Sequence, residues 1–191
     1  MNLLDTMLEA NRNFVRPGLL PPLPKNPQRQ IAIFTCMDTR LVDFLEPALG
    51  ITRGDAKVIK NAGNTLIDPL GGVVRSLVVA VFMLGVEEII VIGHRDCGMA
   101  DVDVVGLKER MVSRGIAPSA IDGLIPDLGQ WTGAFACPEE NVASVVSMLR
   151  NSPLLPKDVP IHGLLFCPND GHVEVVVNGY PVDTPRSGEG G

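Results

Sequence analysis

Short apolar runs alternate along the chain with longer stretches whose apolar residues recur at helical spacing. The short runs predict buried strands over residues 31–35, 56–59 and 88–92. The longer stretches predict helices over residues 41–49, 69–84, 102–114 and 140–150. Strands that alternate with helices favour an α/β fold, in which Rossmann-like crossovers join a mostly parallel central sheet flanked by helices.

The C-terminal part of this pattern predicts a hairpin. Leu164–Phe166 and Val173–Val177 are apolar runs on either side of Asn169-Asp170-Gly171, a sequence that favours a tight turn. We therefore expect a closing antiparallel strand at one edge of the sheet. The stretch from residue 115 to 139 is rich in Gly and Pro and is expected to be irregular.

The N-terminal region differs from the rest of the chain. Residues 3–15 have the spacing of an amphipathic helix, and the prolines between Pro17 and Pro24 predict an extended arm. Such a helix can dock on its own chain or on a second subunit. We therefore divide the chain into an N-terminal helix and Pro-rich arm (1–28), a single α/β domain (29–180) and a flexible tail (181–191).

Composition excludes several classes of protein. With 46% hydrophobic and 20% charged residues, the chain is globular, and Leu77–Val86, its longest uncharged apolar run, predicts a buried helix rather than a membrane span. A net charge of −6 offers no basic surface for nucleic acid. The N-terminus has no basic and apolar export signal, so we expect a cytoplasmic protein. Aromatic residues make up only 4%, which favours a small ligand over one that needs stacking.

Reactive side chains are concentrated in two segments, each just after a predicted strand. They are Cys36-Met37-Asp38-Thr39-Arg40 and Gly93-His94-Arg95-Asp96-Cys97-Gly98-Met99. If the first and third strands are neighbours, both segments face the crevice at the carboxyl ends of the strands. Cys36, His94 and Cys97 then converge.

Two thiolates and one imidazole are good ligands for Zn²⁺, and three protein ligands leave one coordination position for water or substrate. A single Cys at a strand end is more often a small buried apolar residue, but chance is a poor explanation for these residues together. Cys137 and Cys167 fit no ligand spacing and are expected to be structural. Without an export signal, all four cysteines are expected to be reduced.

Asp38 and Arg40 follow the first expected ligand at short spacing. Two thiolates cancel the charge of the zinc ion, so an acceptor that holds a zinc-bound hydroxide by its proton would help. Asp38 is placed for this role, and Arg40 could keep Asp38 ionised and correctly aimed. Asp96 is expected to cap the following helix or to orient a neighbour. Asp68 and Arg75 could reach the site or pair with each other.

These residues resemble a known family. Cys36-x-Asp38-x-Arg40, then Asn61-Ala62-Gly63-Asn64, then His94-x-x-Cys97 is similar to the motif set of the β-class carbonic anhydrases, and the low aromatic content and short length resemble their compact branch. The resemblance implies zinc on Cys36, His94 and Cys97, catalytic residues Asp38 and Arg40, and reversible hydration of carbon dioxide to bicarbonate and a proton. It also implies a homodimer or a multiple of dimers, with the N-terminal helix packed on the partner. We expect Asn61, Ala62, Gly63 and Gly98 to line the pocket.

One departure and two alternatives remain open. Family members often carry Thr after the zinc-binding His, whereas this chain has Arg95. Carbon disulfide and carbonyl sulfide hydrolases resemble the family in fold and zinc ligation, so either compound could be the substrate. In some family members the aspartate closes the zinc site at low pH. A site closed permanently by Asp38 would instead make the protein a non-catalytic zinc-binding interaction module.

Overall fold

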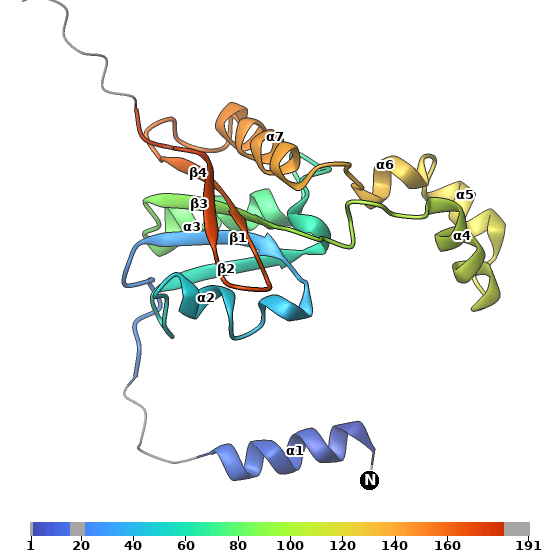
Figure 1. The fold of residues 1–191 in the computed structure, drawn as a ribbon, viewed down its shortest axis with the longest axis horizontal. Helices are drawn as coiled ribbons and strands as arrows, with labels where there is room; N and C mark the ends of the chain where they lie inside the picture. The colour runs from blue at the N-terminus through green and yellow to red at the C-terminus, as the bar shows by residue number, and fades with distance from the viewer. Residues whose placement is uncertain (1, 16–21, 182–191) are drawn as a thin grey trace, which may run out of the picture.

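Five strands form one sheet with the spatial order β2-β1-β3-β4-β5 (Figure 1). The structure is a computed structural model, and it describes residues 2–15 and 22–181. The strands are β1 (Ile31–Cys36), β2 (Ala56–Asn61), β3 (Glu88–His94), β4 (Ile161–Phe166) and β5 (Val173–Val177). The first four run parallel, and β5 pairs antiparallel with β4. The predicted fold class is therefore confirmed, including the closing antiparallel edge strand.

Helices connect and cover these strands. Their bounds are α1 (Leu3–Phe14), the 3₁₀ helix η1 (Thr39–Leu41), α2 (Leu45–Ala48), the 3₁₀ helix η2 (Ala62–Asn64), α3 (Gly72–Leu84), α4 (Val104–Ser113), α5 (Pro118–Leu124), α6 (Leu128–Thr132) and α7 (Pro138–Asn151). In Figure 1, α4, α5 and α6 form a group beside the sheet, and α1 lies clear of it. Among the described residues, no helix is both long and apolar enough to cross a membrane.

Two predicted elements are corrected by the structure. The helix expected over 41–49 is reduced to α2, because a proline ring collides with the carbonyl four residues earlier and must therefore lie in the first helical turn. Pro47 thus prevents a helix that includes Asp43, and Asp43 has a positive φ of 54°. The stretch 115–139 is not irregular: Pro118 begins α5, and the side chain of Asp127 caps α6. Its Pro and Gly residues mark the ends of helices.

The N-terminal helix is confirmed as a helix, and a capping box at Asn2 and Asp5 stabilises its first turn. None of its residues is buried in this chain. The arm predicted around Pro17–Pro24 lies partly outside the described residues, as does the predicted tail from residue 182 onward.

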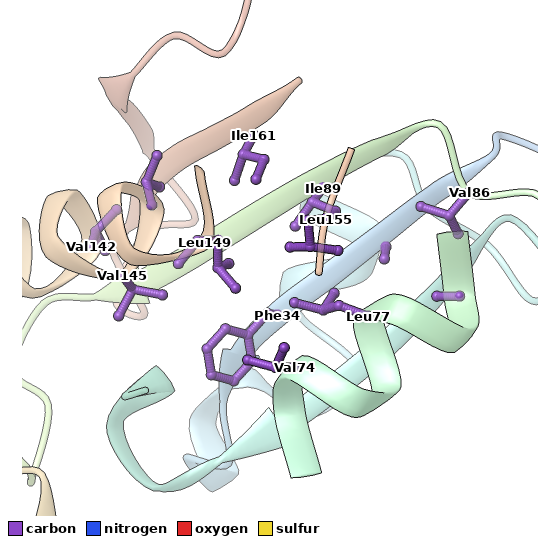
Figure 2. Packing of buried hydrophobic residues seen from close by; sticks show 14 residues of the cluster. Phe34, Val74, Leu77, Val86, Ile89, Val142, Val145, Leu149, Leu155 and Ile161 are labelled. Atoms are coloured by element: carbon purple, nitrogen blue, oxygen red, sulfur yellow. The ribbon is translucent and has the colours of Figure 1, made fainter. Parts of the chain in front are cut away.

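Alternate residues of the strands supply two apolar layers. The larger layer packs between the sheet and helices α3 and α7, with Phe34 and Ile89 from the strands against Leu77 and Leu149 from the helices (Figure 2). The second layer, on the opposite face, includes Ile33 and Ile92 of the strands and Leu45 of α2. It extends to the ends of β1 and β3. Helix α3 buries only one of its faces. The run Leu77–Val86, predicted as a buried helix, is therefore buried on one face, at Leu77, Ala80 and Val86, and exposed at Phe82 and Met83.

Two glycines let α7 approach the sheet closely. A Cβ atom at Gly93 of β3 would lie 2.6 Å from Val142 Cγ2, and one at Gly163 of β4 would lie 2.7 Å from Val142 Cγ1. Interiors are close-packed, so an added methyl group has no space unless Val142 moves. The contact fixes α7 directly behind the end of β3, where His94 lies.

This contact predicts a coupling between Gly93 and Val142. We expect Gly93→Ala to lower the free energy of unfolding by about 1–3 kcal/mol through overpacking, and Val142→Ala to lower it by about 2 kcal/mol through a cavity. The double variant should cost at least about 0.5 kcal/mol less than the sum, because each change relieves the other. Urea denaturation measures all three. Pairing Gly93→Ala with Val145→Ala, one turn along α7, is the control and should be additive; additive costs for Val142 as well would contradict the packing argument.

Candidate metal centre

The parallel pairing of β1 and β3 brings the two reactive segments together. Thr35 lies opposite Ile92 in the register, and the buried Thr35 hydroxyl donates a hydrogen bond to the Ile92 carbonyl at 2.8 Å. Cys36 and His94 end these strands at the same edge of the sheet, and Cys97 follows in a turn. In a sheet of order 2-1-3-4-5, strands 1 and 3 form the switch point at which a crevice opens.

The side chains of Cys36, His94 and Cys97 form a compact, buried group. Their ligand atoms all lie within 4.8 Å of one another. The Nδ1 atom of His94 lies 2.9 Å from the carbonyl oxygen of Arg95, and because that oxygen can only accept, Nδ1 carries the proton. The Nε2 atom is buried without a hydrogen-bond partner. Its lone pair is therefore available for a metal ion.

The donor set fits Zn²⁺. The Cys36 and Cys97 sulfur atoms are 3.9 Å apart, close to the roughly 3.8 Å that tetrahedral coordination with Zn–S bonds of about 2.3 Å requires. A disulfide would need a separation of about 2 Å. Thiolates with an imidazole suit zinc, whereas Mg²⁺ and Ca²⁺ prefer oxygen ligands. The buried orphaned nitrogen and the sulfur spacing thus both favour zinc.

Arg40 binds Asp38 through a bidentate ion pair. Nε of Arg40 donates to Asp38 Oδ1 at 3.0 Å and Nη2 donates to Oδ2 at 2.8 Å, and the backbone N–H of Arg40 adds a third bond to Oδ1. The Oδ2 atom lies 3.7 Å from His94 Nε2. The carboxylate of Asp38 is thus beside the ligand group and is turned toward Arg40.

Arg40 also binds the second reactive segment. Its Nη1 donates to the Asp96 carboxylate at 2.7 Å and its Nη2 to the Asp96 carbonyl oxygen at 2.6 Å. Asp96 therefore orients a neighbour, the second of the two roles expected for it. It does not cap a helix, because the next helix, α4, begins at Val104 and is capped by Asp103.

The charges of the centre support one another. Hydrogen bonds from Arg40 lower the pKa of Asp38 to about 2 despite partial burial, so this carboxylate is ionised at neutral pH. A hydrogen bond from Cys97 lowers the pKa of Cys36, whereas the same bond and burial raise the pKa of Cys97. Burial lowers the pKa of His94, but the neighbouring Cys36 sulfur and the contact with the Arg95 carbonyl outweigh burial and raise it. One thiolate is therefore favoured before any metal binds.

A cleft of about 390 Å³ opens over the ligand group. Ala62, Gly63 and Gly98, three of the four residues expected to line the pocket, line it together with Met37 and Met99. Asn61 is not among the lining residues. Its side-chain amide instead donates to the Thr65 carbonyl at 2.8 Å and closes the turn that contains Gly63.

Gly63 allows the chain to pass close to the cleft wall. Its φ is 69°, and a Cβ atom there would lie 2.8 Å from the Cβ of Met99 and 3.0 Å from the ring of Phe135. The Gly63 carbonyl accepts a hydrogen bond from Asn141 of α7 at 3.1 Å. Sequence reasoning missed Phe135 and Asn141, because they are more than 70 residues away from Gly63 along the chain and no motif marks them.

Other reactive residues lie outside the cleft. Neither Asp68 nor Arg75 lines it, and Asp68 accepts a hydrogen bond from the backbone N–H of Leu70. Cys137 donates to Glu139 at 3.2 Å and does not belong to the ligand group. Cys167 is also separate from that group.

Together, fold and site define an α/β domain with a three-ligand metal-binding group at the switch point of its sheet. A family model described as carbonic anhydrase matches residues 31–173. The crystal structure of β-carbonic anhydrase isoform I from Trichomonas vaginalis is 44% identical, with a TM-score of 0.90 over 94% of this chain and 100% of that one.

Two curated relatives extend the comparison. β-Carbonic anhydrase 1 of Mycobacterium tuberculosis is 32% identical over 167 residues, covering 87% of this chain and 93% of the relative. A carbon disulfide hydrolase of Acidithiobacillus thiooxidans is 33% identical over 162 residues, covering 79% and 78%. The chain belongs to the β-carbonic anhydrase family of enzymes.

The tight turn at Gly63 predicts a sensitive position in the cleft. We expect Gly63→Ala to lower the free energy of unfolding by about 2 kcal/mol, because alanine is strained at positive φ and its methyl group meets Met99. Gly98→Ala is the matched control from the same cleft, since a Cβ atom there has nothing within 4 Å. Thermal or urea unfolding measures both. Equal, small costs at the two positions would show that the Gly63 contact is not restrictive.

Proposed function

We propose that this protein is a zinc enzyme that reversibly hydrates carbon dioxide to bicarbonate and a proton. The observation that carries the proposal is the convergence of the Cys36 and Cys97 thiols with the free Nε2 of His94, beside a carboxylate held by arginine. Membership of the β-carbonic anhydrase family supports it.

Each residue of the centre has a task that follows from its contacts. Zn²⁺ held by Cys36, His94 and Cys97 would supply a Lewis acid that lowers the pKa of water. Asp38 is ionised and therefore only accepts hydrogen bonds. It orients an attacking O–H group by accepting a hydrogen bond from that group. Arg40 keeps Asp38 ionised and binds both of its carboxylate oxygens, of which Oδ2 lies 3.7 Å from His94 Nε2. This arrangement favours an open, catalytic site over one closed by Asp38.

The cleft suits a small substrate that forms few hydrogen bonds. Ala62, Met37 and Met99 give it apolar walls, while Asp38 and Arg40 supply its charged side. Carbon dioxide is linear and donates no hydrogen bond, so an apolar slot beside the oriented nucleophile is sufficient for its binding. Because the thiol ligands must stay reduced, we propose a cytoplasmic location.

The catalytic proposal predicts distinct effects for three variants. Wild type should bind one zinc ion per chain and hydrate carbon dioxide in a pH-indicator assay. Cys97→Ser should lose zinc, because it removes a ligand. Asp38→Asn should keep zinc but lose about 100-fold or more in kcat, because the amide orients the nucleophile poorly. Cys167→Ser is the matched control and should change neither.

Two results would contradict this proposal. Zinc-loaded wild type without hydration activity would exclude a carbonic anhydrase. Release of hydrogen sulfide from carbon disulfide or carbonyl sulfide, at a higher kcat/KM than hydration of carbon dioxide, would identify the alternative hydrolase, an activity named for a 33% identical relative.

We also propose that the chain works as a homodimer or a multiple of dimers. Helix α1 exposes Leu4, Met7 and Phe14, each more than half exposed, and buries none of its residues in this chain. Helix α3 exposes Phe82 and Met83 on the face turned away from the sheet. Two apolar helix faces of this kind are costly in water and typical of subunit interfaces. A second copy of the chain would cover both.

The proposed interface is tested by charge substitutions on α1 and α3. We expect wild type to sediment as a dimer or larger, and Met7→Glu or Phe82→Glu to shift the distribution toward the monomer, because each buries a charge at the interface. Glu9→Gln, on the same helix as Met7, is the control and should leave sedimentation unchanged. A wild-type protein that stays monomeric at all concentrations would contradict the proposal.

A further inference from the structure

The orientation of the His94 ring depends on one carbonyl group. Nδ1 of His94 donates to the Arg95 carbonyl oxygen at 2.9 Å, and this bond leaves the lone pair on Nε2 facing the two thiols. Metal-binding histidines are commonly oriented by such a second hydrogen bond. Whatever fixes the Arg95 peptide therefore fixes the tautomer and the direction of the ring.

The turn that carries this carbonyl is not held by local preference alone. Asp96, the next residue, has a φ of 55°, in the left-handed region that is sparsely populated for side chains other than Gly. Residues in such conformations persist when surrounding contacts over-determine them. Arg40 holds this turn by binding Asp96. Arg95 adds contacts that connect the turn to other elements of the fold.

Arg95 is anchored to three elements. Its backbone N–H donates to the Phe166 carbonyl at the end of β4, at 2.9 Å. Its Nη2 donates to both carboxylate oxygens of Glu174 in β5, at 2.8 and 2.9 Å. Its Nη1 donates to Glu139 in the first turn of α7, at 3.3 Å. The side chain therefore links β5 and α7 to the residue whose carbonyl holds His94.

We propose that Arg95 is a positioning residue for the metal centre, which holds its own carbonyl against His94 Nδ1 through its ion pairs with Glu174 and Glu139. The inference rests on the proposed function to the extent that Cys36, His94 and Cys97 hold zinc. Arg95 contacts neither the ligand atoms nor the cleft, so it acts on the centre only through His94.

The effect should be local rather than global. The Arg95, Glu174 and Glu139 side chains are each between about one third and one half exposed, and ion pairs at such positions add little to overall stability. Removing a direct partner of a metal-binding histidine typically costs 10–100-fold in metal affinity. Substitution of the Arg95 side chain leaves the partner carbonyl in place and only loosens its position. We therefore expect a smaller loss of zinc affinity, roughly three- to tenfold.

The test compares Arg95→Met with Arg95→Lys, and with Arg29→Met as the matched control. Arg29 is similarly exposed and pairs with the buried Asp55 at the opposite end of the sheet, so its loss removes an arginine ion pair far from the centre. The zinc dissociation constant is measured by chelator competition, and the visible spectrum of the Co²⁺-substituted protein reports coordination geometry. The ¹⁵N shifts of His94 in the metal-free, reduced protein, at a pH where the ring is neutral, report its tautomer.

We expect Arg95→Met to raise the zinc dissociation constant three- to tenfold, change the Co²⁺ spectrum and increase the share of the Nε2–H tautomer. Arg95→Lys should rescue part of each effect, because lysine keeps the positive charge but lacks the several fixed N–H donors of the guanidinium group. Arg29→Met should match wild type. If Arg95→Met and Arg29→Met behave alike in all three measurements, the inference is wrong. If wild type takes up no zinc, the proposed function fails, while the ¹⁵N shifts still decide the role of Arg95.

Discussion

The parallel pairing of β1 with β3 is the constraint on which the metal-binding group depends. Parallel neighbours end at the same edge of a sheet, so Cys36 and His94 meet although 57 residues separate their strands in the register. The Thr35 hydroxyl reinforces this register from within the core. A shift of one residue would turn His94 to the other face of the sheet and separate the ligands.

Around that pairing, charge holds the loops in place. Arg40 ties the loop after β1 to the turn after β3 by binding Asp38 and Asp96 at once. Arg95 ties the same turn to β5 and α7. Apolar packing supports the opposite side, where Val142 of α7 lies against two glycines of the sheet. Ion pairs therefore stabilise the metal-binding group on its solvent side, and close packing stabilises it on its core side.

Local patterns predicted most of the strands and several helices, because buried strands and amphipathic helices have distinct hydrophobic periods. They failed where one residue outweighed the periodicity. Pro47 shortened the helix expected over 41–49, and Pro118 and Asp127 began helices where an irregular segment was expected. Helix α3 was predicted as buried because composition measures apolar content and not which face meets the sheet.

By itself, the sequence determined the identity of the ligand side chains, since cysteine, histidine and the Asp38–Arg40 spacing carry their chemistry at short range. Only the tertiary structure decided which atoms meet. It set the tautomer of His94, turned Asp38 toward Arg40 and brought Asn141 and Phe135 to Gly63. These contacts join segments that are distant along the chain, and their geometry follows from strand order and packing, which local residue patterns do not specify.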